Sequence, residues 1–504
     1  MDFLKNQYLV IKGIADFKEY NDTDTVKFND FTIIHSKKLN CSFCTSKVSS
    51  VLLLGYILDP LNPDYSNNDI IDSLANSSKT LDEFIKNTQK YSGRFVLIYS
   101  NKTESVMFSD AFGLRQIYFN QFEGSVIFSS APKLILEYRN WKPNLSEAAS
   151  ALINSDNFKK RESAWLGEGW YDNRIKKVLP NHYLDLNKME IYRAPFFLPK
   201  ISDTEIVSYS KKILTGSFIA LSKRFDKIIQ AVTAGWDSRL LLAASKVLKD
   251  RITYFVFINN FSQIKEKDAV IANKLASKLG IDFHTIFPGK LKKDFLDKYN
   301  KICFYPRILP KTANIQWHYY DNMGKNTINI NGNGGEILRQ VYYYFENKNS
   351  VNVQTFLTTL DYPEYFRDTL TYWYKSALPF AQKYNLSILD LFYWEQRIGN
   401  WHALYQYEQD IAIEEFTPFN NKDFILAIMQ IDSKKREKMN CFICKELMKE
   451  LWSETLEVPI NPILGLSLRK RIGNFIKKSS FIYGFWRKII NNKLSLNKWS
   501  RHFE

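Results

Sequence analysis

An alternation of short apolar runs and amphipathic stretches between Ile228 and Ile330 restricts the fold more than any other feature of the sequence. Gly280 follows the second amphipathic stretch, a position where glycine commonly ends a helix. The expected strands are 228–232, 253–258, 281–287 and 327–330, and the expected helices are 237–249 and 267–279. Strands that alternate with such helices indicate an α/β fold with a doubly wound parallel sheet, which binds ligands at the carboxyl ends of its strands. Beyond about residue 365 the pattern is mostly helical.

The first 195 residues have a different pattern, with short apolar or alternating runs separated by turns. Gly113 and Gly124 fall between these runs, as turns require. The runs are 94–100, 105–108, 116–120 and 125–129. Strands this close in sequence pair antiparallel. Pro195 and Pro199 then interrupt the pattern, so we place a domain boundary near residue 200.

The length of 504 residues predicts two to four domains at roughly 150 residues each. An apolar fraction of 45% with 15% aromatic residues excludes a disordered or collagen-like chain. The most apolar run, Val48–Leu58, is too short to span a membrane. The start, Met1–Lys5, lacks the basic and apolar regions of a secretory signal. We therefore expect a soluble, cytoplasmic, multi-domain protein.

The formal net charge of +16 suggests binding to nucleic acid or to a membrane surface, but much of it lies in one segment. Residues 466–504 hold ten Lys or Arg and a single acid, Glu504. Aromatic and aliphatic pairs recur there at nearly helical spacing, which is typical of a basic amphipathic helix on an anionic membrane. The same pattern also suits a helix that packs on its own domain. The rest of the chain is mildly basic, and we expect no nucleic-acid partner.

Four of the five cysteines form two C-x-x-C pairs, Cys41–Cys44 and Cys441–Cys444. Four thiolates could together bind zinc. The alternative is two unrelated local pairs of reduced thiols, since the pairs stand four hundred residues apart.

The loop Val232–Ser238 (VTAGWDS) joins the first expected strand of the parallel sheet to its helix. A tight loop of small residues lets backbone N–H groups approach an anion, and the helix amino terminus adds positive potential. Thr233 and Ser238 offer hydroxyls to phosphate, and Asp237 suits a Mg²⁺ bound to that phosphate. The alternative is an ordinary helix cap. Neither a Walker loop nor a dinucleotide-binding fingerprint occurs in the sequence.

The segment Thr233–Ser238 (TAGWDS) resembles the S-G-G-x-D-S loop of the ATP pyrophosphatase, or PP-loop, enzymes, and most of all the synthetase domain of the asparagine synthetase family. Four further segments are similar to that family, in the same order. They are 266–284, 331–336 (NGNGGE, for S-G-E-G-[AS]-D), 414–419 (EEFTPF, for E-V-R-V-P-F) and 444–451.

The first half is similar to the same family. The matching segments are 93–95, 109–113, 118–119, 128–133 and 175–182. The resemblance covers most of residues 50–460 and implies three parts. These are a glutaminase-like αββα sandwich of the Ntn-hydrolase type in 1–199, an ATP-binding PP-loop domain with a Rossmann-like sheet in 200–465, and the basic tail 466–504.

The resemblance implies that a carboxylate is activated by ATP as an acyl-adenylate, with release of pyrophosphate, and is then attacked by an amine. It assigns the pyrophosphate to Thr233, Gly235 and Ser238, and it includes Ala234 and Trp236 of the same loop in the ATP-binding set. It assigns Mg²⁺ to Asp237 and Glu336, and the adenine and ribose to Val232, Val256, Asn331 and Gly332. Lys445 is a candidate to neutralise the leaving pyrophosphate, or else a solvated helix lysine.

The family's glutaminase uses an N-terminal cysteine as its nucleophile. Residue 2 here is Asp, and the first cysteine is Cys41, so we expect the first domain to keep the fold without hydrolysing glutamine. In the synthetase half, Asn333 replaces a glutamate and Asn461 lies near an expected lysine. Losing the glutamate removes a candidate base, which favours an acceptor other than aspartate with ammonia.

Relatives that lack the cysteine include β-lactam synthetases and lasso-peptide cyclases, which use an amine of the substrate itself. The expected substrates are a small-molecule, sugar-acid or peptide carboxylate together with ammonia or an amine, and a homodimer is common in the family. The leading hypothesis is an amide-forming ligase. An inactive scaffold that keeps only the fold is the main alternative, and a PP-loop enzyme that modifies tRNA is a third.

Overall fold

The computed structural model describes residues 6–13, 20–197, 201–258, 267–302, 311–322, 325–340, 342, 351–437 and 441–462. The domain boundary expected at 199–200, Glu266, Cys303 and the basic tail 466–504 lie outside the described residues. Among the described helices, none combines the length and the apolar character that a membrane span requires.

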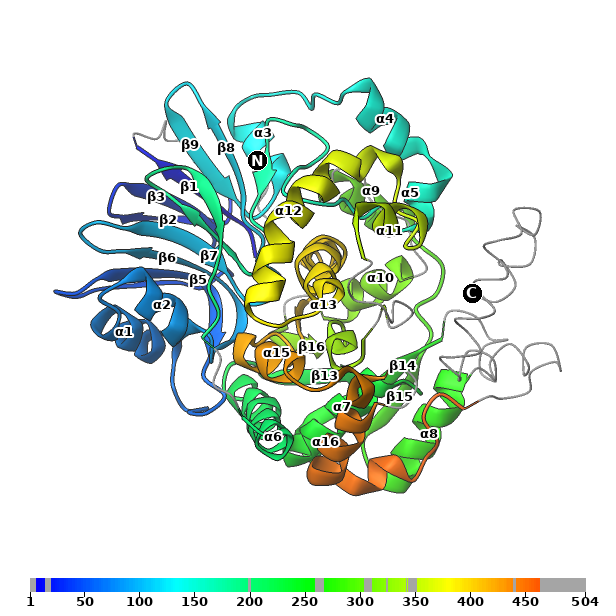
Figure 1. Cartoon of the computed structure of the whole chain (residues 1–504). Coiled ribbons are helices and arrows are strands. Elements are labelled where there is room, and N and C mark those ends of the chain that lie inside the picture. The colour runs from blue at the N-terminus through cyan, green and yellow to red at the C-terminus, as the bar shows by residue number, and fades with distance from the viewer. Residues whose placement is uncertain are drawn as a thin grey trace.

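Two six-stranded antiparallel sheets make up the first half of the chain (Figure 1). The first has the order β10 (Lys176–Lys177), β8 (Tyr118–Phe122), β9 (Ser125–Ser129), β1 (Tyr8–Lys12), β3 (Phe31–Ser36), β2 (Thr23–Phe28). The second has the order β12 (Glu190–Arg193), β11 (His182–Asp185), β7 (Ser105–Ser109), β6 (Ser92–Ser100), β5 (Ser50–Leu58), β4 (Cys41–Thr45). The expected strand 125–129 coincides with β9. Strand β6 begins two residues earlier than expected, β7 ends one residue later, and β8 lies two residues further along the chain than expected.

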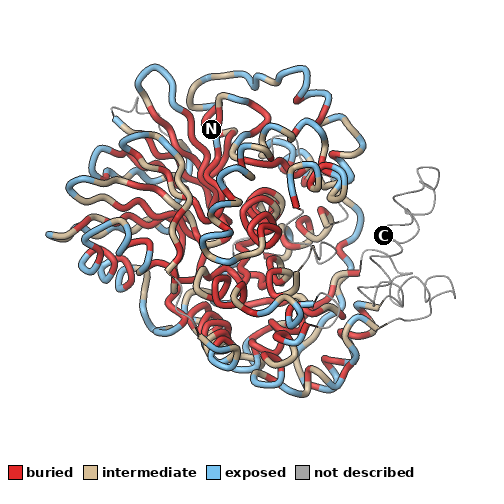
Figure 2. The backbone as a smooth tube through the Cα atoms, viewed as in Figure 1, coloured by how far each residue is buried: buried red, intermediate tan, exposed pale blue. Residues whose placement is uncertain are grey.

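Alternating side chains hold this half together in four layers. Val10 and Ile33 of one sheet meet Leu52 and Val96 of the other in a buried core between the sheets. The far face of the second sheet packs on α1 (Asn67–Ser77) and α2 (Leu81–Thr88). The far face of the first sheet packs on α3 (Pro132–Tyr138). This arrangement is the expected αββα sandwich, and Figure 2 shows much of the backbone of its strands as buried.

A five-stranded parallel sheet forms the centre of the second half. Its order is β15 (Phe283–Ile286), β14 (Ile252–Phe257), β13 (Lys227–Ala231), β16 (Thr327–Ile330), β17 (Glu414–Phe416). Helices cover both of its faces: the Tyr254 hydroxyl bonds Ser245 of one helical layer, and the Phe255 and Phe257 rings contact His318 of the other. The sheet is therefore doubly wound, as the sequence predicts.

The two helices expected in this half lie where the sequence predicts them, but one of them differs from the prediction in length. The first expected helix, 237–249, is α7 (Trp236–Ala244) continued by a 3₁₀ turn (Ser245–Arg251), whereas α8 (Lys267–Leu279) has the expected bounds. The other helices are α4 (Glu147–Asn154), α5 (Asp156–Lys160), α6 (Asp203–Leu221), α9 (Lys293–Ile302), α10 (Thr312–Asp321), α11 (Val353–Thr358), α12 (Arg367–Lys383), α13 (Ile388–Phe392), α14 (Ala403–Gln409), α15 (Lys422–Met429) and α16 (Phe442–Trp452). Strand β17 interrupts a region that the sequence predicts as helical.

The zinc hypothesis is not supported by the described residues. Cys441 and Cys444 form a disulfide at the start of α16, whereas Cys41 and Cys44 are free thiols on the edge strand β4. Across the part of the chain that the structure describes, no three His, Cys, Asp or Glu side chains gather as metal ligands would. The two pairs are separate local features.

A buried ion network joins the two halves. The Arg94 guanidinium, on β6, bonds both Asp410 oxygens at 2.6 and 2.8 Å and Glu414 Oε1 at 2.8 Å. Arg115 lies 3.4 Å from the same Glu414 oxygen. All four side chains are at most 6% exposed. Because Glu414 begins β17, the first half fixes the position of that strand.

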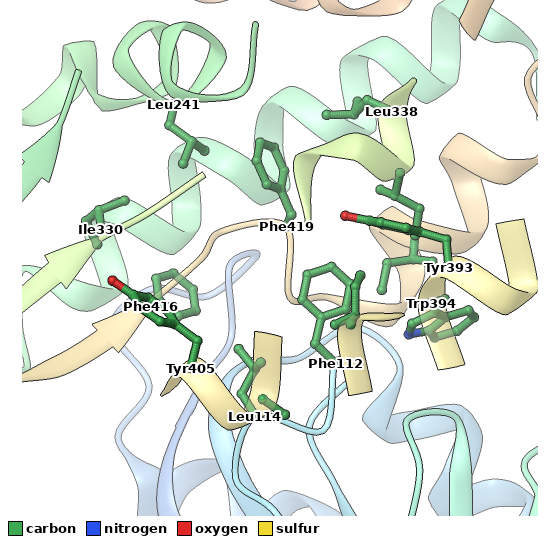
Figure 3. Close-up of a cluster of buried hydrophobic side chains, with 14 of the residues drawn as sticks. Phe112, Leu114, Leu241, Ile330, Leu338, Tyr393, Trp394, Tyr405, Phe416 and Phe419 are labelled. Carbon is green, nitrogen blue, oxygen red and sulfur yellow. The ribbon is translucent and has the colours of Figure 1, made fainter. Parts of the chain in front are cut away.

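Apolar packing strengthens the same contact. Phe112 and Leu114 of the first half reach the cluster formed by Leu338, Trp394, Phe416 and Phe419 (Figure 3). A Cβ added to Gly334 would lie 2.4 Å from the Phe112 ring. The first half therefore supports the loop 331–336 directly.

We predict that Arg94→Leu lowers the free energy of unfolding by about 3–5 kcal/mol, because the buried Asp410 loses its counter-ion and Glu414 keeps only Arg115. Urea unfolding of the full chain measures this change. The control is Lys211→Ala, which removes an exposed pair with Glu450 and should cost less than about 1 kcal/mol. Equal effects of the two substitutions would contradict the prediction.

Candidate active site

A cavity of about 520 Å³ lies at the carboxyl ends of β13, β14 and β16. It is the place where a doubly wound sheet binds ligands. Eight of the residues expected at the site line it: Thr233, Gly235, Asp237, Ser238, Val256, Asn331, Gly332 and Glu336. The loop after β13 and the loop after β16 are thus brought together, although a hundred residues separate them.

Four of the expected residues do not line this cavity. Val232 and Ala234 are fully buried behind the loop, and Trp236 turns into the hydrophobic core with 7% of its surface exposed. Lys445 lies half-buried on α16, a helix that packs against α7 rather than on the cavity. Val232, Ala234 and Trp236 thus lie on the buried side of the loop, and Lys445 lies on a neighbouring helix.

Hydrogen bonds within the loop 233–238 hold its shape. The Thr233 and Ser238 hydroxyl oxygens lie 2.7 Å apart, and the Thr233 N–H donates to Ser238 Oγ at 3.1 Å. The Gly235 N–H donates to Thr233 Oγ1 at 3.2 Å. One of the two hydroxyls donates to the other, and the Thr233 carbonyl, 3.4 Å from Ser238 Oγ, is a further acceptor for the Ser238 hydroxyl.

Two distant segments anchor the loop from outside. The Ala234 N–H donates to Asp268 Oδ1 at 2.9 Å, and the Ala234 carbonyl accepts the Asn461 N–H at 2.9 Å. The buried Arg239 of α7 donates to carbonyls of Thr455, Val458 and Pro459, which fastens the segment that carries Asn461. Asn461, noted in the sequence for its side chain, acts on the loop through its backbone.

An anion at the loop would meet the start of α7. This nine-residue helix begins after Gly235, and no side chain of the described residues caps it. Its first N–H groups therefore face the cavity end of the loop with the positive end of the helix dipole. These groups make a donor-rich wall that suits phosphate oxygens.

Two carboxylates lie beside that wall, Asp237 in the first turn of α7 and Glu336 on the loop after β16, and each is held by a partner. Asp237 Oδ2 accepts from Arg339 Nη2, and Glu336 Oε2 accepts the Tyr393 hydroxyl at 2.6 Å. Burial raises the pKa of Asp237 to about 6; Glu336 adds to this rise, whereas Arg339 opposes it. Tyr393 begins a π-helix, Tyr393–His402, and such helices often occur at functional sites. The sequence analysis did not identify either partner.

These carboxylates fit a magnesium ion. Asp237 Oδ1 is buried and has no hydrogen-bond partner within the described residues, so one ligand position remains available. In phosphate sites Mg²⁺ takes one or two protein carboxylates, substrate oxygens and water. Asp237 and Glu336 would supply the two carboxylates. Because Arg339 engages the second Asp237 oxygen, Oδ1 is the oxygen that would bind the metal ion.

The other end of the cavity has a different character. Lys311, Asn314 and His318 of α10 and Glu415 of β17 line it, and the sequence analysis assigned none of them. Burial lowers the pKa of His318 to about 3 and raises the pKa of Glu415 to about 7. This end is considered further below.

Comparisons with known proteins add little beyond the fold. No family model and no curated protein sequence matches the chain. Among solved structures, a glutamine phosphoribosylpyrophosphate amidotransferase from B. subtilis with ADP and GMP is 9% identical, with a TM-score of 0.24, over 65% of this chain and 69% of that one. An NMN synthetase from Francisella tularensis is 18% identical (TM-score 0.20) over 28% of this chain and 59% of its own length.

A glutamine-dependent NAD⁺ synthetase from Acinetobacter baumannii, in complex with ADP, is 10% identical. That match covers 47% of this chain and 57% of the synthetase, with a TM-score of 0.19. The chain thus spans less than two thirds of either synthetase. Likenesses this distant say nothing of what this chain binds or catalyses.

We predict that Gly335→Ala weakens Mg²⁺-dependent ADP binding by about tenfold, or about 1.4 kcal/mol. An added Cβ would lie 2.7 Å from Asp237 Oδ1 and must displace that carboxylate. Isothermal titration with and without Mg²⁺ measures the effect. Gly169→Ala is the matched control, since its Cβ meets Trp165 Nε1 at an ordinary 3.5 Å.

We predict that His318 makes the protein less stable in acid. Below about pH 6.5 the unfolded chain binds a proton at this histidine, whereas the buried ring stays neutral to about pH 3. Between pH 7.5 and 5.0 the wild type should therefore lose about 2 kcal/mol more stability than His318→Phe. Urea unfolding at both pH values measures the difference. Parallel losses in the two proteins would refute the prediction.

Proposed function

We propose that the chain is an ATP-dependent ligase of the asparagine synthetase type, which forms an amide bond. It would activate a carboxylate as an acyl-adenylate, release pyrophosphate, and transfer the acyl group to ammonia or to an amine of the substrate. The observation that carries this proposal is the presence of a loop with an uncapped helix start and two neighbouring carboxylates in one cavity, at the carboxyl ends of a parallel sheet.

Each part of the cavity has a role in this proposal. The loop 233–238 and the start of α7 would hold the pyrophosphate part of the nucleotide. Val256 and its neighbours on β14 would wall the base, and Asn331 and Gly332 would approach the ribose and the α-phosphate. Asp237 and Glu336 would hold Mg²⁺, which supplies neutralisation of the phosphate charge.

The first half of the chain would serve as a support without glutaminase chemistry. Arg94 stands in the segment 93–95, which is similar to the family, and its guanidinium is engaged by Asp410 and Glu414. Ammonia or an amine would then come from outside the first half. Small-molecule, sugar-acid and peptide acids are the substrates to consider.

One observation favours the alternative of an inactive scaffold. Arg339 holds Asp237, and Asp268 occupies the Ala234 N–H, so part of the anion-binding surface is already bonded within the protein. A scaffold would keep these bonds permanently. An enzyme would keep Asp237 Oδ1 for the metal and the helix start for the phosphate.

Pyrophosphate exchange into ATP, tested over a panel of carboxylates, separates the two. We expect exchange that depends on one carboxylate class and falls about 100-fold or more in Asp237→Asn, since a metal ion supplies several kcal/mol of charge stabilisation. Asp321→Asn, at the end of α10 and outside the cavity, is the control. Absence of exchange over the whole panel, with the protein folded, would favour the scaffold.

A further inference from the structure

The cavity has two ends with different chemistry. In the sheet order, β14 and β17 are separated by three strand intervals, roughly 14 Å. The β14 end is walled by apolar side chains, among them Phe255, Val256 and Ile258. The β17 end is polar, with Asn329, Asn331 and Glu415. A nucleotide base suits the first end, so the second end faces a different part of the ligand.

Glu415 is a buried carboxylate bonded only by neutral groups. It is 1% exposed, and its oxygens accept from Asn329 Nδ2 at 2.7 Å, Asn331 Nδ2 at 2.8 Å and Gln406 Nε2 at 3.2 Å. No ion pair joins it to a Lys or Arg of the described residues. Burying a carboxylate without a counter-ion is costly, and burial accordingly raises its pKa to about 7.

Hydrogen-bond acceptors are also in excess around Glu415. Asn329 Oδ1 is buried without a partner, and its orientation is fixed because the amide nitrogen must face the carboxylate. Asn314 Oδ1, on the cavity wall formed by α10, has no partner either. A ligand that donates hydrogen bonds and carries positive charge would satisfy all three groups.

The neighbouring cations do not serve Glu415. Arg94 acts on it only from a distance, since its guanidinium is engaged by Asp410 and Glu414. Lys311 also lowers the pKa of Glu415 through its charge but makes no ion pair with it among the described residues, and its ammonium lies over the rings of Trp401 and Tyr405, 5.3 and 5.4 Å from their centroids. The position of the counter-ion therefore remains for a ligand.

We propose that the β17 end of the cavity binds a primary ammonium group of a substrate, with Glu415 as its counter-ion and Asn329 and Asn314 as acceptors. The inference rests on the proposed function, because it names a charged feature of one substrate of that ligase. It concerns recognition, and no bond is made or broken. Lys311, on the same wall, would then face an anionic part of the ligand.

The test uses ethylammonium chloride as the probe and the full chain, with sodium chloride at the same ionic strength as the reference. We expect a saturable rise in the Tm of the wild type that is specific to ethylammonium. In Glu415→Gln the half-saturating concentration should rise at least about tenfold, the loss of about 1.4 kcal/mol of binding. The exposed Glu364→Gln is the control and should behave as the wild type does.

Two results would overturn the proposal: no ethylammonium-specific shift in the wild type, or an equal shift in Glu415→Gln. A shift that appears only in Lys311→Met would do the same, because it would make Lys311 the natural counter-ion. If Glu415→Gln does not fold, Asn314→Leu on the half-buried wall of α10 replaces it, with a weaker ethylammonium response expected.

ADP binding, measured in parallel, keeps this inference apart from the proposed function. Glu415→Gln should bind ADP within about twofold of the wild type, less than about 0.5 kcal/mol. A large loss of ADP affinity would mean that Glu415 contacts the nucleotide, and would overturn the ammonium assignment. Failure of the wild type to bind ADP would instead remove the proposed function, while the ethylammonium result would stand by itself.

Discussion

The Arg94 guanidinium, buried between the two halves, is the interaction on which the site depends. It bonds Asp410 in two places and Glu414 in one, and Glu414 precedes the cavity residue Glu415. A three-residue strand with two acidic residues has little tendency to form alone. The ion network and the packing of Phe416 stabilise β17, which has little intrinsic preference for a strand. The strand therefore depends on its contacts with the first half of the chain.

Contacts from the first half also reach the part of the cavity beside the loop 233–238. Phe112 of the first half packs on Gly334, and the next residue, Gly335, packs on Asp237. A displacement of the loop 331–336 would therefore displace the loop 233–238 as well. Neither glycine tolerates a Cβ at the observed distances. The sandwich thus has a structural role at the site, because Phe112 packs on the loop 331–336 and Arg94 holds β17.

Local patterns in the sequence predicted the elements that are stabilised locally. Helix α8 and strand β16 have the expected bounds because their periodicity and end signals agree. Strand β17 could not be predicted, since its stability comes from Arg94, some 320 residues away. The loop 233–238 was predicted by its spacing, whereas Arg339, Tyr393 and Glu415 reach the cavity only through tertiary contacts. Asn461 was singled out in the sequence for its side chain, whereas in the structure its backbone N–H bonds the loop 233–238.

The cavity presents donors at one place and acceptors at another, and this polarity restricts how a ligand can lie in it. The loop after β13 and the start of α7 offer N–H and O–H groups, which repel a cation. The β17 end offers Glu415 and unpartnered amide oxygens, which repel a phosphate. A ligand that reversed its orientation would meet like charge at both ends. Asp237 and Glu336 stand near the donors, where a metal ion would convert two further acceptors into part of the phosphate site. Glu415, on the strand that the first half holds in place, then offers its carboxylate to a substrate.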